Sequence, residues 1–332
     1  MQDLEKILEK LSSVHVLSVG DVMIDRFLQG KVERISPEAP VPIFQFVQER
    51  KMLGGAGNVV ANLNALGCQT SFVSIVGDDD LGKGVASLLK KLNADYFLLK
   101  LSDRPTIMKA RFIAGNNHIL RFDKEKILPL TQEQEQEILN QIKQKMPSCD
   151  IVLISDYAKG LLSSSLTQDI ISLAKKESKM VLVDPKGQDY SKYKGAFLIK
   201  PNRKELEQVS GQSLDISSED FLSEISETAR YVLKKYDIEN MVVTLGEKGM
   251  FYISSNPSVK EIYLPTAARE VFDVSGAGDT SLSMLGLALA CDASIEQSMI
   301  LANLAAGVVV GKVGTATVKV SEIEQMLRAV SE

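Results

Sequence analysis

The chain has 332 residues, a hydrophobic share of 45% and a net charge of −5. This length and apolar content suit one large α/β domain, or a domain with a small accessory part. The acidic balance argues against a general nucleic-acid or membrane-surface binder. The sequence has no signal-peptide core and no apolar run long enough to span a membrane, so we expect a cytoplasmic protein.

Two alternating segments interrupt the N-terminal half of the chain. An amphipathic helix is predicted over 1–11 and a buried strand over 14–19. Residues 22–50 alternate but contain Pro37, Pro40 and Pro42, which predicts short strands with irregular connections. Residues 103–124 alternate around Gly115-Asn116-Asn117, a hairpin signal. We expect the two insertions, about 22–50 and 103–124, to form a small β lid at one edge of the main sheet.

The other segments alternate between strand and helix patterns. Strands are expected over 72–76, 151–154, 181–183, 197–199, 241–245, 250–254 and 261–264. Helices are expected over 54–66, 81–92, 131–146, 163–177, 203–209, 219–236, 279–290, 295–311 and 321–329. This order predicts a mostly parallel sheet with helices on both faces.

The stretch from Val271 to Leu282 carries the strongest functional signal. A short apolar strand ending near Val274 is expected to meet Gly276, Ala277 and Gly278, and a helix follows from Asp279. Small residues let the backbone approach a ligand, and the first turn of a helix offers free N–H groups to an anion. Asp279 could accept a proton beside a phosphoryl group held there. The alternative is an ordinary Gly-rich helix entry.

Polar residues also follow the predicted strands at the sheet edge where open α/β proteins bind ligands. Asp21 could accept hydrogen bonds from sugar hydroxyls, or it could simply form a turn. Gly54, Gly55 and Asn58 place bare backbone and an amide at a helix start, which also fits a close-packed helix entry. Asp156 and Lys186 lie in polar segments after two later strands.

The segment 200–205 repeats this arrangement and includes Arg203 and Lys204. Asn202 and Glu205 lie three residues apart at a helix start, so they face the same way and could orient hydrated magnesium. A capping box would explain the same pair.

The turn after Thr244, with Gly246 and Gly249, could form a tight hairpin or the floor of a nucleotide site. Asn303 and the small residues after it would let a flat base approach a late helix, or they could serve helix packing.

The lid region contains a group of cations. Lys109 and Arg111 share a face of one predicted strand, and Arg121 lies on its hairpin partner. Together they could hold a phosphate or carboxylate. An ordinary charged edge strand is the alternative.

Two motifs together resemble the paired signatures of the ribokinase-like (PfkB) carbohydrate kinases. They are Asp273-x-x-Gly276-Ala277-Gly278-Asp279 and Gly54-Gly55-x-x-Asn58, and Asn202-x-x-Glu205 lies between them in the family order. The resemblance covers essentially the whole chain and implies a three-layer α/β/α fold. Within the family, the runs 34–42, 155–160 and 306–317 resemble the heptose 7-phosphate kinases of lipopolysaccharide-core assembly.

The resemblance implies an ATP- and magnesium-dependent transfer to the anomeric hydroxyl of D-glycero-D-manno-heptose 7-phosphate. By motif position Asp279 would be the base and Gly276 to Gly278 the anion hole, and Asn202 to Glu205 would hold ATP and magnesium. Sugar contacts would come from Asp21, Gly54, Gly55, Asn58 and Asp156. Nucleotide contacts would come from Lys186, Thr244, Gly246, Gly249 and Asn303.

The resemblance further implies a homodimer through the lid and a possible response to potassium. Because many heptose kinases are fused to an adenylyltransferase and this chain stops at Glu332, we expect the stand-alone form. A kinase of another sugar, such as a hexose phosphate or ribose, is an alternative. A non-catalytic nucleotide- or sugar-binding regulator on the same scaffold is another.

Overall fold

The computed structural model describes residues 2–115, 117–215, 217–268, 271–312 and 314–331. Three residues that the sequence interpretation used lie outside this description. They are Met1 of the expected first helix, Asn116 of the expected hairpin turn and Val313 of the 306–317 run.

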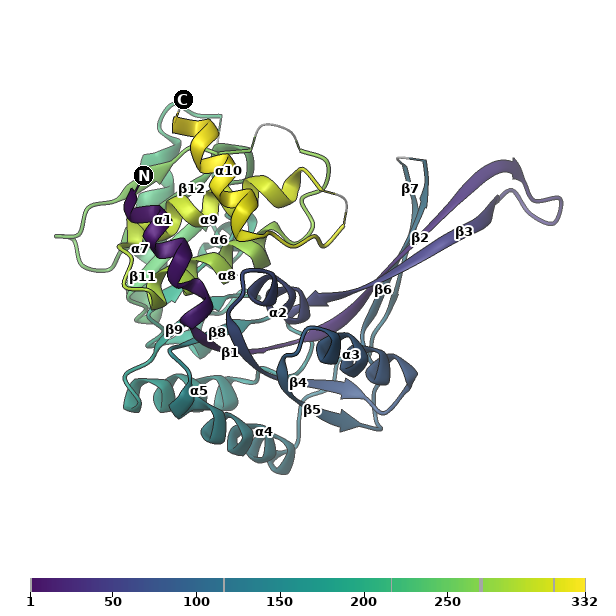
Figure 1. Ribbon diagram of the computed structural model, residues 1–332, viewed down its shortest axis with the longest axis horizontal. Coiled ribbons are helices and arrows are strands. Elements are labelled where there is room, and N and C mark those ends of the chain that lie inside the picture. The colour runs from purple at the N-terminus through teal and green to yellow at the C-terminus, as the bar shows by residue number, and fades with distance from the viewer. Residues whose placement is uncertain (1, 116, 216, 269–270, 313, 332) are drawn as a thin grey trace.

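Within the described residues, the main sheet has nine strands in the order β13-β12-β11-β10-β9-β8-β1-β4-β5 (Figure 1). All pairs from β5 through to β11 are parallel. β12 is antiparallel to both of its neighbours, β11 and β13. The strand bounds are β1 His15–Gly20, β4 Gln69–Gly77, β5 Asp95–Leu101, β8 Ile151–Ser155, β9 Met180–Asp184, β10 Leu198–Ile199, β11 Asn240–Thr244, β12 Met250–Ser254 and β13 Ile262–Leu264. The mostly parallel sheet is confirmed, whereas the edge strand β5 was not predicted.

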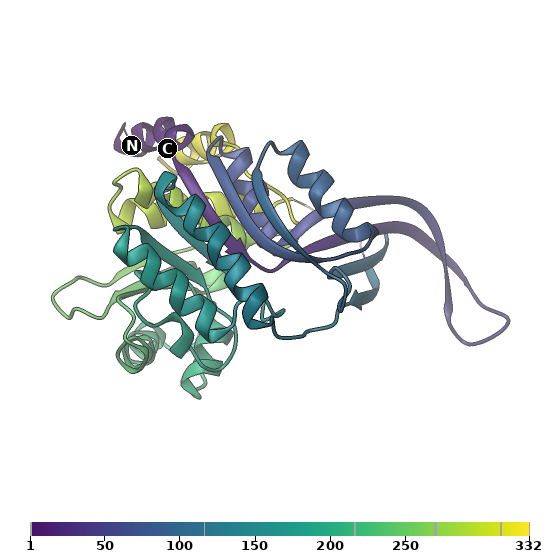
Figure 2. The ribbon, with the colours of Figure 1, turned by 90° about the horizontal axis from the view of Figure 1, so that it is seen from below.

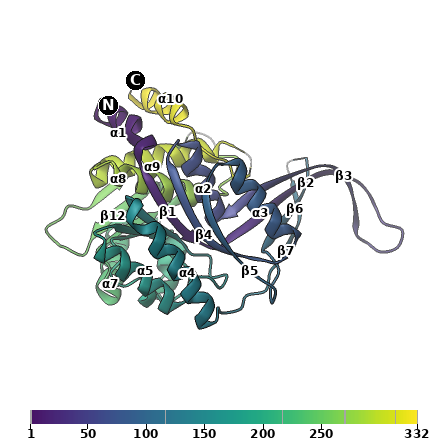
Figure 3. The ribbon, with the colours of Figure 1, turned by 60° about the horizontal axis from the view of Figure 1, so that its bottom comes forward.

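Helices cover both faces of this sheet, which confirms the three-layer architecture (Figures 2 and 3). One face packs on α4 Gln132–Lys145, α5 Ser164–Lys176, α6 Arg203–Ser210 and α7 Phe221–Tyr236. The other packs on α1 Gln2–Lys10, α2 Ala56–Ala65, α8 Ala277–Ala290, α9 Ile295–Val310 and α10 Val320–Ser331. The helix α3 Asp80–Lys91 packs on β4 near the lid.

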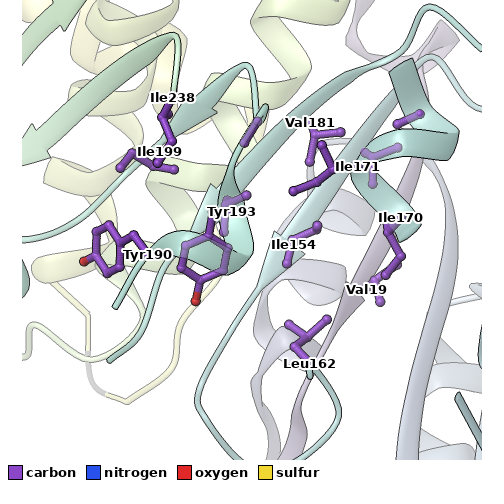
Figure 4. Packing of buried hydrophobic residues seen from close by; sticks show 14 of the residues in the cluster. Val19, Ile154, Leu162, Ile170, Ile171, Val181, Tyr190, Tyr193, Ile199 and Ile238 are labelled. Atoms are coloured by element: carbon purple, nitrogen blue, oxygen red, sulfur yellow. The ribbon is translucent and has the colours of Figure 1, made fainter. Parts of the chain in front are cut away.

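Side chains alternate along each strand between the two hydrophobic cores, one on each face of the sheet. On β8, Val152 and Ile154 belong to the first core, and Ile151 and Leu153 belong to the second. Figure 4 shows Ile154 of the first core with Val19 and Val181 of the neighbouring strands. Because both faces are buried, the parallel strands are mostly apolar, although a few buried serines such as Ser18 and Ser74 interrupt them.

The lid is a separate sheet in the order β3-β2-β6-β7, formed by β2 Val22–Ile35, β3 Pro42–Gly55, β6 Met108–Ala114 and β7 Asn117–Lys124. The expectation of short, irregular strands over 22–50 was wrong, because β2 and β3 have 14 residues each. Pro37 and Pro40 lie in the connection at the tip, and Pro42 only begins β3, so the prolines do not interrupt the pairing. The two strands project away from the body (Figure 1).

The expected strand before α8 is absent. Residues 271–274 form no strand, and Val271, Phe272 and Val274 are 62%, 69% and 70% exposed. Hydrogen bonds hold the segment as a loop, since the Asp273 carboxylate accepts the N–H groups of Ser275 and Gly314. The helix itself starts at Ala277, two residues before the expected Asp279.

Among the described residues, no helix is both long and apolar enough to cross a membrane.

Candidate active site

A cavity of about 920 Å³ opens at the carboxyl ends of β8, β9, β10 and β11. Its wall includes every residue that the sequence assigned to the nucleotide: Lys186, Asn202, Arg203, Lys204, Glu205, Thr244, Gly246, Gly249 and Asn303. Asp156, Ala277 and Gly278 also line it. The other predicted site residues lie outside this wall, namely Asp21, Gly54, Gly55, Asn58, Lys109, Arg111, Arg121, Gly276 and Asp279. The nucleotide set therefore forms one surface.

The start of α8 meets this cavity with open backbone. Gly276 is the N-cap, has the left-handed φ of 84° and supplies no side-chain cap. A Cβ at Gly276 would lie 2.6 Å from the Asn58 amide nitrogen, so only glycine fits there. The Ala277 N–H donates to the Val274 carbonyl at 3.3 Å, so that amide is partly occupied in the expected anion hole. Since no side chain caps the helix, the following N–H groups of the first turn could receive an anion.

A buried cation lies beside the same turn. Lys200 is 2% exposed and forms an ion pair of 3.2 Å with Asp184. A Cβ on Gly278 would lie 3.5 Å from the Lys200 ammonium. The helix tip therefore combines its dipole with a lysine, which favours a bound phosphate.

Asp279 lies in the first turn of α8 and is 3% exposed. The Asn58 amide donates to Oδ2 at 2.9 Å, and the Tyr157 hydroxyl donates to Oδ1 at 2.8 Å. Burial raises the pKa of Asp279 to about 7, and the Asp184 charge adds to this. The two hydrogen bonds and the Lys200 charge oppose the rise. The carboxylate is thus poised near neutrality, as a general base requires.

Asp21 is also buried, at 1% exposed, but it serves the backbone. Its oxygens accept the N–H groups of Tyr157 at 3.1 Å, Lys159 at 3.0 Å and Leu161 at 3.1 Å. Burial raises the pKa of Asp21 to about 6, with the Asp156 charge second. The carboxylate fixes the loop after β8, and its contact with a sugar stays a prediction.

Asp156 is similarly engaged. It accepts the Ala158 N–H at 2.6 Å and the Tyr193 hydroxyl at 2.7 Å, and it pairs with Lys192. These groups contact both carboxylate oxygens of Asp156. Its role in substrate binding stays a prediction.

The nucleotide residues are partly committed to each other. Asn202 and Glu205 form a full capping box at the start of α6, so the alternative explanation holds for this pair. The Lys186 ammonium donates to Oε1 of Glu205 at 2.8 Å, the oxygen that the capping box leaves free. The Arg203 guanidinium donates to Glu207 at 3.1 Å. The Asn303 amide donates to the Pro265 carbonyl at 2.7 Å, so it supports the cavity wall.

Oxygen donors at the cavity suit magnesium. The described residues contain no group of three or more His, Cys, Asp or Glu side chains that could cage a metal. Direct ligation by Asn202 or Glu205 would also break the capping box. The side chains present therefore fit a hydrated ion held through its water molecules.

On the other side of Asp279, the lid root supplies charge. Asp25 is 3% exposed and pairs with Arg111, whose guanidinium lies 5.1 Å from the centroid of the Phe27 ring. A Cβ on Gly54 would lie 2.2 Å from the Asp25 carboxylate, which makes glycine necessary there. Gly55, with φ 58°, ends β3.

The strand register places Arg111 opposite Arg121, with Lys109 two residues along, so the three cations share a face as expected. Arg121 pairs with Asp123 at 3.0 Å. Burial lowers the pKa of Lys109, and Lys159 adds to this effect. The charges of Asp25 and Asp123 oppose this lowering, but the Lys109 ammonium forms no hydrogen bond or ion pair with the described chain, so it could reach an anionic ligand.

The sequence interpretation assigned no role to Tyr157, Asp184 or Lys200. Each stands at or just after the end of a strand at the ligand edge, after β8, at β9 and after β10 respectively. That position was the available signal, but the contacts with α8 depend on the tertiary fold.

The profile described as pfkB family carbohydrate kinase matches residues 14–322. The bifunctional protein HldE of Aliarcobacter butzleri is 42% identical over 310 residues, which is 93% of this chain and 63% of that protein. HldE of Paramagnetospirillum magneticum is 43% identical over 309 residues, or 93% and 62%. The chain thus spans less than two thirds of these curated relatives.

Among solved structures, the fold resembles Escherichia coli phosphofructokinase-2 in complex with potassium. The TM-score is 0.77 at 20% identity, and the match covers 96% of this chain and 99% of that one. At this identity the likeness supports the fold.

Proposed function

This chain belongs to the pfkB family of carbohydrate kinases and is therefore a phosphotransferase with an alcohol group as acceptor, and we propose that its acceptor is D-glycero-D-manno-heptose 7-phosphate. ATP would phosphorylate the anomeric hydroxyl to give the 1,7-bisphosphate and ADP, on the route to ADP-heptose and lipopolysaccharide core. The runs 34–42 and 155–160, which resemble the heptose 7-phosphate kinases, support this choice. So does the similarity to the two HldE proteins.

One observation carries the catalytic proposal: Asp279 lies at the tip of α8 between two chemically different surroundings. Ala277 and Gly278 of the same helix line the nucleotide cavity, whereas Asn58 approaches the carboxylate from α2. A terminal phosphate at the helix tip and a hydroxyl at Asp279 would therefore be neighbours. In a loose transition state the hydroxyl keeps its proton until late, so a carboxylate with a pKa of about 7 is basic enough.

Asn202 and Glu205 would hold magnesium through water, and the ion would neutralise charge on the transferring phosphoryl group. Lys186 and Lys200 would supply positive charge from the protein, one at the cavity wall and one under the helix tip. The possible response to potassium is tested by assaying with potassium and with sodium at equal ionic strength.

Lys109, Arg111 and Arg121 favour a phosphorylated acceptor. They lie on one face of the lid sheet, and Lys109 is half-buried between Asp25 and Asp123 in the strand register. Its ammonium makes no hydrogen bond or ion pair within the described chain, and an anionic ligand would offset the cost of its burial.

We also propose a homodimer through the lid. Its opposite face carries an apolar cluster beyond the Arg26–Glu49 ion pair: register aligns Leu28, Phe112 and Leu120, with Phe122 and Phe46 on the same side. Phe46, Leu120 and Phe122 are 60%, 58% and 52% exposed, and an apolar face of this kind indicates a partner surface.

An acceptor screen tests the substrate. Purified protein with magnesium and ATP is assayed for ADP release with heptose 7-phosphate, fructose 6-phosphate, ribose 5-phosphate, ribose and fructose. We expect heptose 7-phosphate to give the highest kcat/KM, and product analysis should place the new phosphate on O1. A preference for unphosphorylated sugars would contradict the role of the lid cations. Stabilisation by ATP and magnesium without ADP release would indicate a non-catalytic binder.

A further inference from the structure

The loop after β8, residues 156–161, connects a buried carboxylate to the Asp279 carboxylate. Asp21 accepts hydrogen bonds from the N–H groups of every second residue of this loop, Tyr157, Lys159 and Leu161, at 3.0 to 3.1 Å. Asp21 directly follows β1 and is 1% exposed, so its position is fixed by the central sheet. The loop is therefore tied to the sheet at three points.

Tyr157 is the residue of this loop that reaches Asp279. Its hydroxyl donates to Oδ1 at 2.8 Å, and its backbone N–H is one of the three held by Asp21. A Cβ on Gly55 would lie 3.5 Å from the Tyr157 ring, so the ring also packs closely on β3. Tyr157 lines the nucleotide cavity as well. Backbone, ring and hydroxyl are thus each fixed by a different element.

We propose that Tyr157 is a positioning residue for the Asp279 base, and that Asp21 acts on the reaction through Tyr157. This inference rests on the proposed function of Asp279. With Asn58 on Oδ2 and Tyr157 on Oδ1, the carboxylate cannot rotate without losing a hydrogen bond. The direction left for the acceptor hydroxyl is therefore set before any ligand binds, which is what preorganisation of a base requires.

The hydroxyl also favours the ionised form of Asp279, because a donor to a carboxylate stabilises its charge. The other charged groups that act on Asp279 are Asp184 on β9, which raises its pKa, and Lys200 after β10, which lowers it. Asp25 on β2 acts on the Tyr157 phenol. Tyr157 itself stays protonated, since burial and the Asp279 charge raise its pKa well above the ordinary value.

The test is Tyr157→Phe, which keeps the ring and removes the donor. We expect the acidic limb of kcat/KM for heptose 7-phosphate, or for the acceptor that the screen selects, to move up by about one pH unit. The loss at pH 7 would be roughly fivefold and would be almost fully recovered at about pH 9. KM for ATP should change less than about twofold.

Tyr252→Phe is the matched control, because Tyr252 is a buried tyrosine outside the cavity wall whose hydroxyl donates to Asn240 at 2.8 Å instead of to Asp279. Its acidic limb should stay in place. An unmoved limb in Tyr157→Phe would overturn the proposal, whether activity is normal or uniformly reduced, because packing alone would then explain the residue.

A second readout needs no turnover. The Asp279 pKa is about 7 in the folded protein against an ordinary 3.8. The stability that neutral Asp279 contributes is therefore complete below about pH 4 and lost as pH rises through about 7. The Tm difference between wild type and Asp279→Asn should follow that curve. The same Tm difference is then measured between Tyr157→Phe and the double variant Tyr157→Phe/Asp279→Asn. In this background the Tm difference should continue to fall to a higher pH than in the wild-type background. If the two curves of Tm difference against pH coincide, the proposal is overturned.

Asp21→Asn tests the second half of the inference. In a double-mutant cycle, we expect its effect on kcat/KM to shrink in the Tyr157→Phe background, because both changes act on one hydrogen bond. Additive effects would show that Asp21 does not act through Tyr157. An Asp279→Asn enzyme that keeps its activity would instead remove the proposed function, so the two failures are distinguishable.

Discussion

Asn58 donates a hydrogen bond of 2.9 Å to Asp279, although the two residues stand 221 positions apart. The donor is braced in turn, because Asn62 on the same helix donates to the Asn58 carbonyl at 3.0 Å, and Thr280, next to Asp279, donates to Asn62 at 3.1 Å. The contact between α2 and α8 is therefore a closed polar network inside the core, and it fixes Asp279, the proposed base, relative to the lid root.

The first prediction concerns this base. Asp279→Asn should lower kcat by about a thousandfold or more while the dissociation constant for ATP changes little, since the amide cannot accept the acceptor proton. In the wild type, kcat/KM for the acceptor should rise with pH up to about 7 and then level off. The sign follows from the raised pKa of about 7: below that value the buried Asp279 is protonated and cannot act as a base.

Initial rates between about pH 5 and about pH 9, with ATP binding by calorimetry, check this expectation. Asp169→Asn is the control, because Asp169 is an exposed aspartate on α5 away from the cavity. Near-normal turnover of Asp279→Asn, or a limb far below pH 7, would contradict the mechanism.

The residues that the sequence assigned to the nucleotide line one cavity, and the reason is geometric, whereas their contact with a nucleotide stays a prediction. Carboxyl ends of parallel strands meet at one edge, so Lys186, Asn202 and Thr244 could be grouped from strand order alone. Which polar groups were already occupied could not be predicted. From the sequence, Asp21 is expected to be an exposed hydrogen-bond acceptor at the end of a strand. In the structure its oxygens accept N–H groups of the loop 157–161. This contact depends on the pairing of β1 with β8, which are more than a hundred residues apart.

The errors in secondary structure have equally specific causes. The apolar residues around Val271 and Val274 suggested a buried strand, but there they remain exposed in a loop at the cavity rim. β5, Asp95–Leu101, lacks a clean alternation because it is an edge strand that is only partly covered. In the lid, β2 pairs with β3 from Val22–Gly55 out to Ile35–Pro42, so the strands continue up to the prolines that suggested short strands.

The second prediction concerns Lys186 at the nucleotide cavity. Lys186→Met should raise KM for ATP by about tenfold, because it removes a cation within reach of bound phosphate. The same change leaves Glu205 without its 2.8 Å partner, so the Lys186→Met/Glu205→Gln variant separates the loss of charge from the unpaired carboxylate. Lys176→Met, an exposed lysine on α5, is the control. An unchanged KM for ATP in both variants would place the phosphates elsewhere.

The third prediction concerns the acceptor phosphate. Lys109→Met should raise KM for heptose 7-phosphate by roughly tenfold to a hundredfold, since a charge-assisted hydrogen bond is lost from a half-buried site. KM for ATP should not change, and any slow reaction with the unphosphorylated sugar should be unaffected. Lys31→Met on the distal part of β2 tests for a general charge effect. Equal losses with phosphorylated and unphosphorylated acceptors would show that Lys109 does not bind the phosphate.

The last prediction concerns the lid as an interface. Phe122→Asp places a charge on the apolar face that also carries Leu120 and Phe46, so it should convert a dimer to a monomer at micromolar concentration. Sedimentation velocity measures the change, and circular dichroism confirms that the fold is kept.

The control is Val259→Asp, at a 40% exposed apolar residue in the connection between β12 and β13, and this change should leave the assembly unchanged. The opposite face of the same sheet carries Arg111, which pairs with Asp25 at the lid root, so kcat/KM should fall together with dimer content. A wild-type protein that sediments as a monomer at all concentrations, with Phe122→Asp equally active, would show that this face serves no dimer.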